Sequence, residues 1–156
     1  MIFRVFINLK NCKFKFHKVK EGVILNRGIA RIISEQGHQD LLMVVDAGFA
    51  IPKEVEVVDI SLSVNNPMVL TVLAELKRCF SVEKIIMAKE TKETSPSLFD
   101  AISQSFGANM PVETIDHANL KQLAKTVKAI IRTGDFTAYG NVILVSGAGE
   151  RWYYEK

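Results

Sequence analysis

Apolar and polar positions alternate in blocks along the chain, and these blocks predict strands and helices in turn. Short continuous apolar runs predict buried strands, whereas apolar residues at helical spacing predict amphipathic helices. The predicted strands are residues 41–45, 55–62, 84–88, 111–115, 129–132 and 141–145, and the predicted helices lie within 26–37, 65–79, 94–106 and 120–127. This alternation predicts an α/β protein: a single-domain three-layer α/β/α sandwich with a mostly parallel mixed sheet.

One stretch, Gly37 to Gly48, combines a helix end, a strand and two titratable side chains. Asn26 is a good N-cap for the first helix, and Gly37 is expected to end that helix in the left-handed conformation. His38 follows, then an apolar strand, and Asp46 stands where the strand ends. Ligands of α/β proteins bind at the carboxyl ends of strands, and an imidazole and a carboxylate can transfer protons near neutral pH.

Each of these residues also has a purely structural interpretation. His38 could be a loop histidine that caps the carbonyls of the preceding helix, with Asp40 orienting its ring in either case. Asp46 could be an Asx-turn residue that stops the strand. His117 and the step Tyr139-Gly140-Asn141 stand beside strands in the same way. These polar groups could converge on one pocket, although each alone is more often loop chemistry.

Composition fits one soluble globular domain: the chain has 156 residues, of which 48% are hydrophobic and 24% charged. The net charge of +3 is uneven, because residues 1–20 hold six of the 20 cations and no acid. The remaining 14 cations face 17 acids, a net charge of −3 that does not favour nucleic acid as a partner.

No apolar run approaches the roughly 18–20 residues of a membrane span. Two cysteines without metal-type spacing make a reducing cytoplasm the expected location.

Several motifs that would indicate other chemistry are absent from the sequence. There is no GxGxxG between a strand and a helix, no P-loop, no HExxH and no GxSxG. The three histidines lack the spacing of a metal site. The sequence therefore does not support a metal site.

From about residue 20 to the end of the last strand, the chain carries a series of short motifs. They are Gly37-His38-x-Asp40, Asp46-Ala47-Gly48, Ile51-Pro52, Asp59-x-Ser61-Leu62, Pro67, His117-x-x-x-Lys121, Ile131-Arg132-x-Gly134 and Tyr139-x-Asn141. Taken together, these motifs resemble those of the D-ribose pyranase family, and no single motif carries the resemblance. The sister family, L-fucose mutarotase, typically continues Asp-Ala-Asn/His-Phe-Pro after the strand. This chain instead has Asp46-Ala47-Gly48-Phe49-Ala50-Ile51-Pro52, a segment that resembles the ribose enzymes more than the fucose mutarotases.

The resemblance implies a sugar-ring isomerase that interconverts the β-pyranose and β-furanose forms of D-ribose by general acid/base ring opening and closing. It implies a cytoplasmic enzyme of ribose catabolism without cofactor or metal, assembled as a homodecamer with its site at a subunit interface. His38 matches the proton donor of the family. The substrate-binding positions match Asp46, His117, Lys121, Tyr139 and Asn141, with Gly140 contributing backbone. An L-fucose-type mutarotase and a non-catalytic sugar-binding accessory module are the alternatives.

Two departures from the family pattern bear on the sugar that is preferred. Pyranases usually carry Leu-Pro where this chain has Phe49-Ala50, and alanine where it has Gly140. Both positions are expected near the pocket, so they leave the sugar preference open.

The expected chemistry also suits these residue types. Opening a hemiacetal requires one proton to leave the anomeric hydroxyl and another to reach the ring oxygen. An imidazole can donate and accept protons near pH 7, and such help accelerates a reaction by roughly 10²–10⁴-fold. Carboxylate, amide and phenol groups are suitable partners for sugar hydroxyls.

Residues 1–18 form a basic N-terminal extension ahead of the domain expected over residues 19–156. A signal peptide is disfavoured, because the apolar part is short and no small-residue cleavage site follows it. Residues 14–20 roughly alternate and could form an added strand. The remaining hypothesis is that translation naturally begins at Val19, where Val19-Lys20-Glu21-Gly22 occupies the place of the family's Met-Lys-Lys-Gly.

Intact-mass measurement of the protein made from its native gene tests this hypothesis. We expect a mass that corresponds to a chain beginning at position 19, and a chain that begins at Met1 would refute the alternative start.

Overall fold

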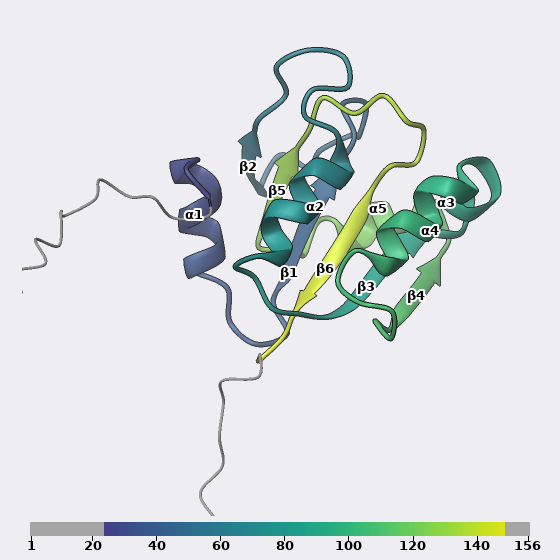
Figure 1. Ribbon diagram of the computed structural model, residues 1–156. Coiled ribbons are helices and arrows are strands. Elements are labelled where there is room, and N and C mark those ends of the chain that lie inside the picture. The colour runs from purple at the N-terminus through teal and green to yellow at the C-terminus, as the bar shows by residue number, and fades with distance from the viewer. Residues whose placement is uncertain (1–23, 149–156) are drawn as a thin grey trace, which may run out of the picture.

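The computed structural model describes residues 24–148, and within them a mixed sheet is packed between two layers (Figure 1). The predicted extension of residues 1–18 lies outside the described residues. The strands are β1 (Leu41–Val45), β2 (Glu56–Asp59), β3 (Val82–Ala88), β4 (Val112–Ile115), β5 (Ala129–Arg132) and β6 (Val142–Ser146). The helices are α1 (Arg27–Ser34), α2 (Val69–Lys77), α3 (Lys89–Thr94), α4 (Pro96–Gln104) and α5 (His117–Leu123). No helix in this part of the chain has the length and apolar character that a membrane span requires.

The strand order in the sheet is β2-β5-β1-β6-β3-β4. β1 pairs in parallel with β5, β5 with β2, and β3 with β4, whereas β6 is antiparallel to both of its neighbours. The prediction of a mostly parallel mixed sheet is therefore confirmed. One consequence matters for the site: β6 begins at the edge where β1 and β5 end.

Alternate side chains of β1 enter two separate cores, which confirms the three-layer prediction. Leu42 and Val44 pack with α1, α2 and α4 on one face of the sheet. Met43 and Val45 pack on the other face with α5 and Phe49. Figure 1 shows α2 in front of the sheet and α5 behind it. Because both faces are covered, β1 needs the continuous apolar run that predicted it.

The first helix begins as predicted but ends differently. The Asn26 side chain accepts a hydrogen bond from the Ile29 amide at 3.0 Å, as an N-cap should. The prediction that Gly37 ends the helix in the left-handed conformation is wrong, because Gln39 instead has the positive φ, 67°. Gly37 donates its N–H to the Asp40 carboxylate at 2.6 Å, and this short turn redirects the chain into β1.

The other differences from prediction are shifted element ends and one additional helix. The strand predicted over 55–62 is only β2, because the chain turns at Asp59, whose carboxylate accepts the Ser61 amide at 2.9 Å. The helix predicted from residue 65 begins at Val69, whose N–H donates to the Asp135 carboxylate at 2.9 Å. α3 was not predicted, and α5 begins at His117, earlier than the predicted residue 120.

Candidate functional site

A reciprocal pair of hydrogen bonds joins Asp46, at the end of β1, to Asn141, just before β6. The Asn141 side-chain oxygen accepts the Asp46 backbone N–H at 3.0 Å, and its amide nitrogen donates to Asp46 Oδ2 at 2.7 Å. Gly48 donates its N–H to Asp46 Oδ1 at 2.9 Å. Both side chains are buried, at 8% and 2% exposure. Burial raises the pKa of Asp46, although the hydrogen bonds from Asn141 and Gly48 oppose the shift.

Two aromatic rings and an imidazole lie beside this pair. The rings of His117 and Tyr139 meet edge to face with centroids 4.9 Å apart, and Phe49 lies tilted against His117 at 6.3 Å. His117 Nε2 is buried and has no hydrogen-bond partner among the described residues. Burial lowers the pKa of His117, and the positive charge of Lys121 lowers it further. A buried ring nitrogen without a partner is uncommon in folded proteins, which makes His117 a candidate for contact with a ligand.

These side chains line a cavity of about 280 Å³, which we call the inner cavity. Of the residues predicted for the site, the inner cavity brings together five: Asp46, His117, Lys121, Tyr139 and Asn141. Phe49 and Ala50 also line it, so one of the two departures from the family pattern faces the ligand space.

Gly140, the other departure, does not line the inner cavity. Its N–H donates to the Thr137 carbonyl at 3.1 Å, so this amide is engaged within the loop. A Cβ at this position would lie 3.0 Å from the Thr137 carbonyl oxygen and 3.5 Å from Leu98. Alanine here would therefore press on the supporting loop rather than enter the ligand space.

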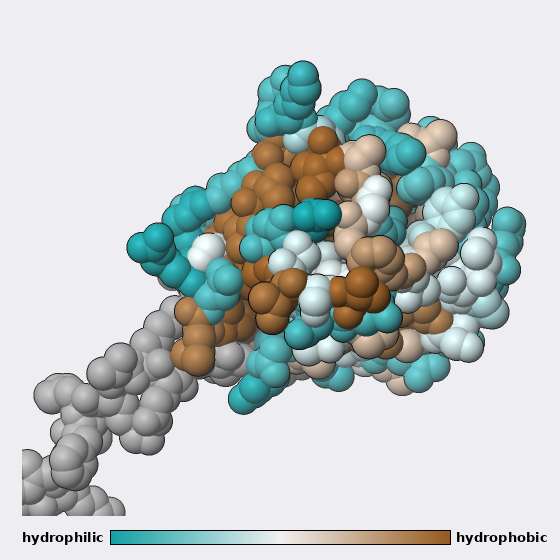
Figure 2. Space-filling view, turned by 90° about the horizontal axis from the view of Figure 1, so that it is seen from above, coloured by the Kyte–Doolittle hydropathy of each residue, from teal (hydrophilic) through white to brown (hydrophobic). Residues whose placement is uncertain are grey.

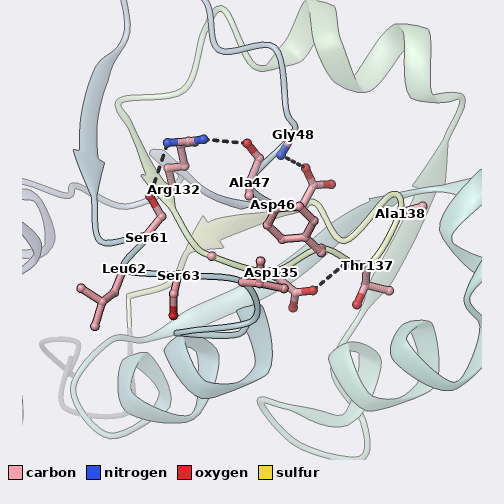
Figure 3. A pocket seen from close by; sticks show the side chains of 13 residues that line it. Asp46, Ala47, Gly48, Ser61, Leu62, Ser63, Arg132, Asp135, Thr137 and Ala138 are labelled. Carbon is pink, nitrogen blue, oxygen red and sulfur yellow. Dashed lines mark hydrogen bonds between the residues drawn. The ribbon is translucent and has the colours of Figure 1, made fainter.

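A second, larger cavity of about 470 Å³, the outer cavity, adjoins the first and shares Asp46, Gly48 and Ala138 with it (Figure 3). Arg132 is its most connected side chain, donating to Asp59 at 2.7 Å, to Ser61 at 3.3 Å and to the Ala47 carbonyl at 2.8 Å. Arg132 thus links the loop after β2 to the loop after Asp46. In the sequence, Arg132 is only one residue of a motif without an assigned role, because its three partners all come from distant segments.

Asp135 was also missed as a supporting residue. It is fully buried, and its carboxylate accepts the N–H groups of Val69 and Thr137, the latter at 2.8 Å. Its carbonyl oxygen accepts the Ala47 N–H at 2.8 Å. Asp135 therefore fixes the start of α2 and both loops that border the cavities. The signal in the sequence was only a Thr-Gly-Asp turn, which does not reveal these partners.

The rim of the outer cavity is apolar. Leu62, Val64 and Phe136 are exposed to 81%, 65% and 65%, and all three line this cavity. Figure 2 views the molecule from this end and shows apolar surface, in brown, across the middle of the face.

His38 lies at the opposite end of the sheet from Asp46. The five residues of β1 stand between them, a length of about 17 Å at the usual rise per residue of a strand. The His38 side chain is 54% exposed, and its Nε2 lies 2.8 Å from the Glu83 carboxylate. The expectation that Asp40 orients this ring is wrong, because Asp40 binds the Gly37 amide and Lys128. Within one chain, the structure does not bring His38 to the inner cavity.

Comparison with known proteins places the chain in a family. The RbsD / FucU transport protein family matches residues 19–149, and the chain belongs to this family. Over 129 residues the chain is 41% identical to the D-ribose pyranase of Halalkalibacterium halodurans, covering 83% of this chain and 98% of the relative. It is 42% identical over 130 residues to the D-ribose pyranase of Kosmotoga olearia, with the same coverage.

Solved structures agree with this placement. Bacillus subtilis RbsD, complexed with D-ribose, matches with a TM-score of 0.80 at 35% identity, covering 84% of this chain and 99% of that one. The fucose mutarotase of Streptococcus pneumoniae, in complex with L-fucose, matches with a TM-score of 0.67, covering 79% of this chain and 93% of that one. It is only 15% identical, so it shows a shared fold alone. The resemblance to the D-ribose pyranase family and the predicted fold are thus confirmed.

The charge of Lys121 provides a test of the His117 environment. Because that charge lowers the pKa of His117, Lys121→Gln should raise the pKa of His117 toward its ordinary value. An NMR titration of the imidazole ring signals measures this, with the His117 signals assigned by their loss in His117→Ala. Lys125→Gln, which removes an exposed lysine near the end of the same helix, is the control and should leave the pKa unchanged. An unchanged or lower pKa of His117 in Lys121→Gln would contradict the placement of the Lys121 charge beside the His117 ring.

Proposed function

We propose that this protein interconverts the β-pyranose and β-furanose forms of D-ribose by general acid/base catalysis. The observation that carries this proposal is the match to D-ribose pyranases at 41–42% identity over 98% of their length. The structure adds support, because the five side chains assigned to sugar binding by resemblance line one cavity. The reaction consists of proton transfers and one C–O bond exchange, so it needs neither a cofactor nor a metal.

The chemistry of the inner cavity suits a small sugar. Asp46 accepts hydrogen bonds, Lys121 donates them, and the phenol of Tyr139 can do both. His117 also lines this cavity, and its imidazole is a further polar group beside the sugar. The rings of Phe49 and Tyr139, which also line the cavity, provide apolar surface for the C–H groups of the sugar. Concave sites of this kind, with a few placed polar groups, orient a ligand by its hydroxyls.

Ring opening requires a base for the anomeric hydroxyl and an acid for the ring oxygen. As the anomeric O–H loses its proton, the bond between the anomeric carbon and the ring oxygen breaks, and the ring oxygen takes up a proton. The open aldehyde then closes on a different hydroxyl by the reverse steps. We assign the proton donor to His38, in line with the family resemblance. Because Glu83 engages Nε2, the other nitrogen, Nδ1, is the one left to exchange a proton with the sugar.

His38 must then come from another subunit, because β1, a strand about 17 Å long, separates it from the inner cavity of its own chain. A homodecamer with sites at subunit interfaces is the assembly that the resemblance implies. The exposed apolar side chains of Leu62, Val64 and Phe136 around the outer cavity support a subunit contact beside the site. On the same resemblance we assign the enzyme to ribose catabolism in the cytoplasm.

Magnetisation exchange between the NMR signals of the ring forms of D-ribose tests the proposed activity. We expect the protein to accelerate exchange between the pyranose and furanose signals. L-Fucose run in parallel should respond less, and the reverse order would favour a mutarotase. Ribose binding without any acceleration would favour the non-catalytic sugar-binding module instead.

A mixing experiment tests the origin of His38. We expect His38→Ala to abolish exchange but to retain weak ribose binding, and His117→Ala to be inactive for lack of a sugar contact. Co-expression of the two inactive variants should restore about a quarter of the activity, because random assembly pairs an intact His38 with an intact His117 at that frequency. Each variant expressed alone is the control. An inactive mixture would contradict donation between subunits, and full activity of His38→Ala would refute the proton-donor assignment.

A further inference from the structure

The two rings that meet in the inner cavity come from separate segments of the chain. His117 is the first residue of α5, and Tyr139 stands in the loop before β6. Their edge-to-face contact at 4.9 Å therefore depends on whatever fixes these segments relative to each other. Both are hydrogen-bonded to the same short helix, α3, through two adjacent residues.

Thr91 holds the backbone of Tyr139. Its side chain is fully buried, and its hydroxyl donates to the Tyr139 carbonyl oxygen at 2.8 Å, across 48 residues of sequence. Tyr139 has a φ of 59°, in the left-handed region that a bulky side chain rarely adopts. Such a conformation persists only where the surrounding structure holds it. The Asn141 N–H, also 2.8 Å from this carbonyl, is the second contact that does so.

Glu90 holds the backbone of His117 in a comparable way. Its carboxylate accepts the His117 N–H at 3.0 and 3.1 Å from its two oxygens, across 27 residues of sequence. The first N–H groups of a helix have no partner inside the helix, and a negative charge at this end is favourable. The side chain of Asp116, the residue before α5, makes no such capping bond. Glu90 thus provides from α3 the partner that the local sequence does not.

We propose that Glu90 and Thr91 are positioning residues for the sugar site, an inference that rests on the proposed function of His117 and Tyr139 as sugar contacts. Neither residue lines the inner or the outer cavity, so neither is expected to touch the sugar. Together they anchor two loops to one helix that directly follows β3. The geometry of the ring pair, and with it ribose binding, depends on both anchors.

Three variants test the Thr91 anchor. Thr91→Val keeps the shape of the side chain and removes the hydroxyl, and it should weaken ribose binding by about tenfold, in proportion to one lost hydrogen bond. Thr91→Ser restores the hydroxyl and should bind ribose nearly as tightly as the unaltered protein. Ser103→Ala is the matched control. It removes a partly buried hydroxyl that donates to the Phe99 carbonyl within the neighbouring helix α4, and Ser103 lines neither cavity.

Glu90 is tested by a similar pair. Glu90→Gln keeps an oxygen that can accept the His117 N–H and should retain most of the binding, whereas Glu90→Ala should lose it. For every variant, thermal unfolding is measured beside ribose binding. A lower melting temperature with unchanged ribose affinity in the folded protein would refute the positioning role.

A readout without sugar separates this inference from the proposed function. The edge of one ring lies over the other, so the chemical shifts of the His117 ring protons in ligand-free protein report the His117–Tyr139 contact. These shifts should change in Thr91→Val and return in Thr91→Ser. If they do so while the unaltered protein fails to bind ribose, the positioning role stands and the assigned ligand is wrong. If they do not change, the positioning role is refuted whatever the ligand.

Discussion

The pairing of Asp46 with Asn141 is the contact on which the site depends. A buried carboxylate is costly to desolvate, and the cost is offset only where donors surround it. Here the Asn141 amide and the Gly48 N–H supply those donors. The pairing is possible because β6 alone runs against the other strands of the described sheet, which brings its first residues to the edge where β1 ends. The loop with Phe49 and the loop with Tyr139 both leave from this pair, so both walls of the inner cavity take their positions from it.

The rest of the site is held by polar groups that never face the ligand space of the inner cavity. Asp135 fixes the loops on one side, Arg132 joins the loop after β2 to the loop after Asp46, and α3 anchors His117 and Tyr139 on the other. Loops that carry function are usually the mobile part of an α/β protein. In this protein, long-range hydrogen bonds to buried or half-buried side chains take the place of regular secondary structure in fixing them.

Prediction from the sequence succeeded where burial determines the pattern. Residues 41–45 and 129–132 were predicted as strands and form β1 and β5, because the residues of a strand that are covered on both faces must be apolar, as all of β1 and the first three residues of β5 are. Prediction from the sequence failed where an element is held by contacts with residues far away in the chain. α3 has the sequence Lys-Glu-Thr-Lys-Glu-Thr and no apolar face. The long-range contacts of Glu90 and Thr91 that hold this helix in place leave no local pattern from which it could be predicted. Five of the residues predicted for the site line one cavity because strand ends share an edge, whereas His38 and Asp46, close in sequence, are kept apart by the strand between them.

That separation has a consequence for how the proposed assembly must close. Each subunit would donate a histidine from one end of β1 and receive one at the other end. A linear array would leave an empty acceptor on one terminal subunit and an unused donor on the other, so only an arrangement that closes on itself uses every copy. In a closed ring, the number of working centres equals the number of chains. A chain that lacks only His38 would then silence the centre of the neighbour it serves, and a chain that lacks only His117 would silence its own centre.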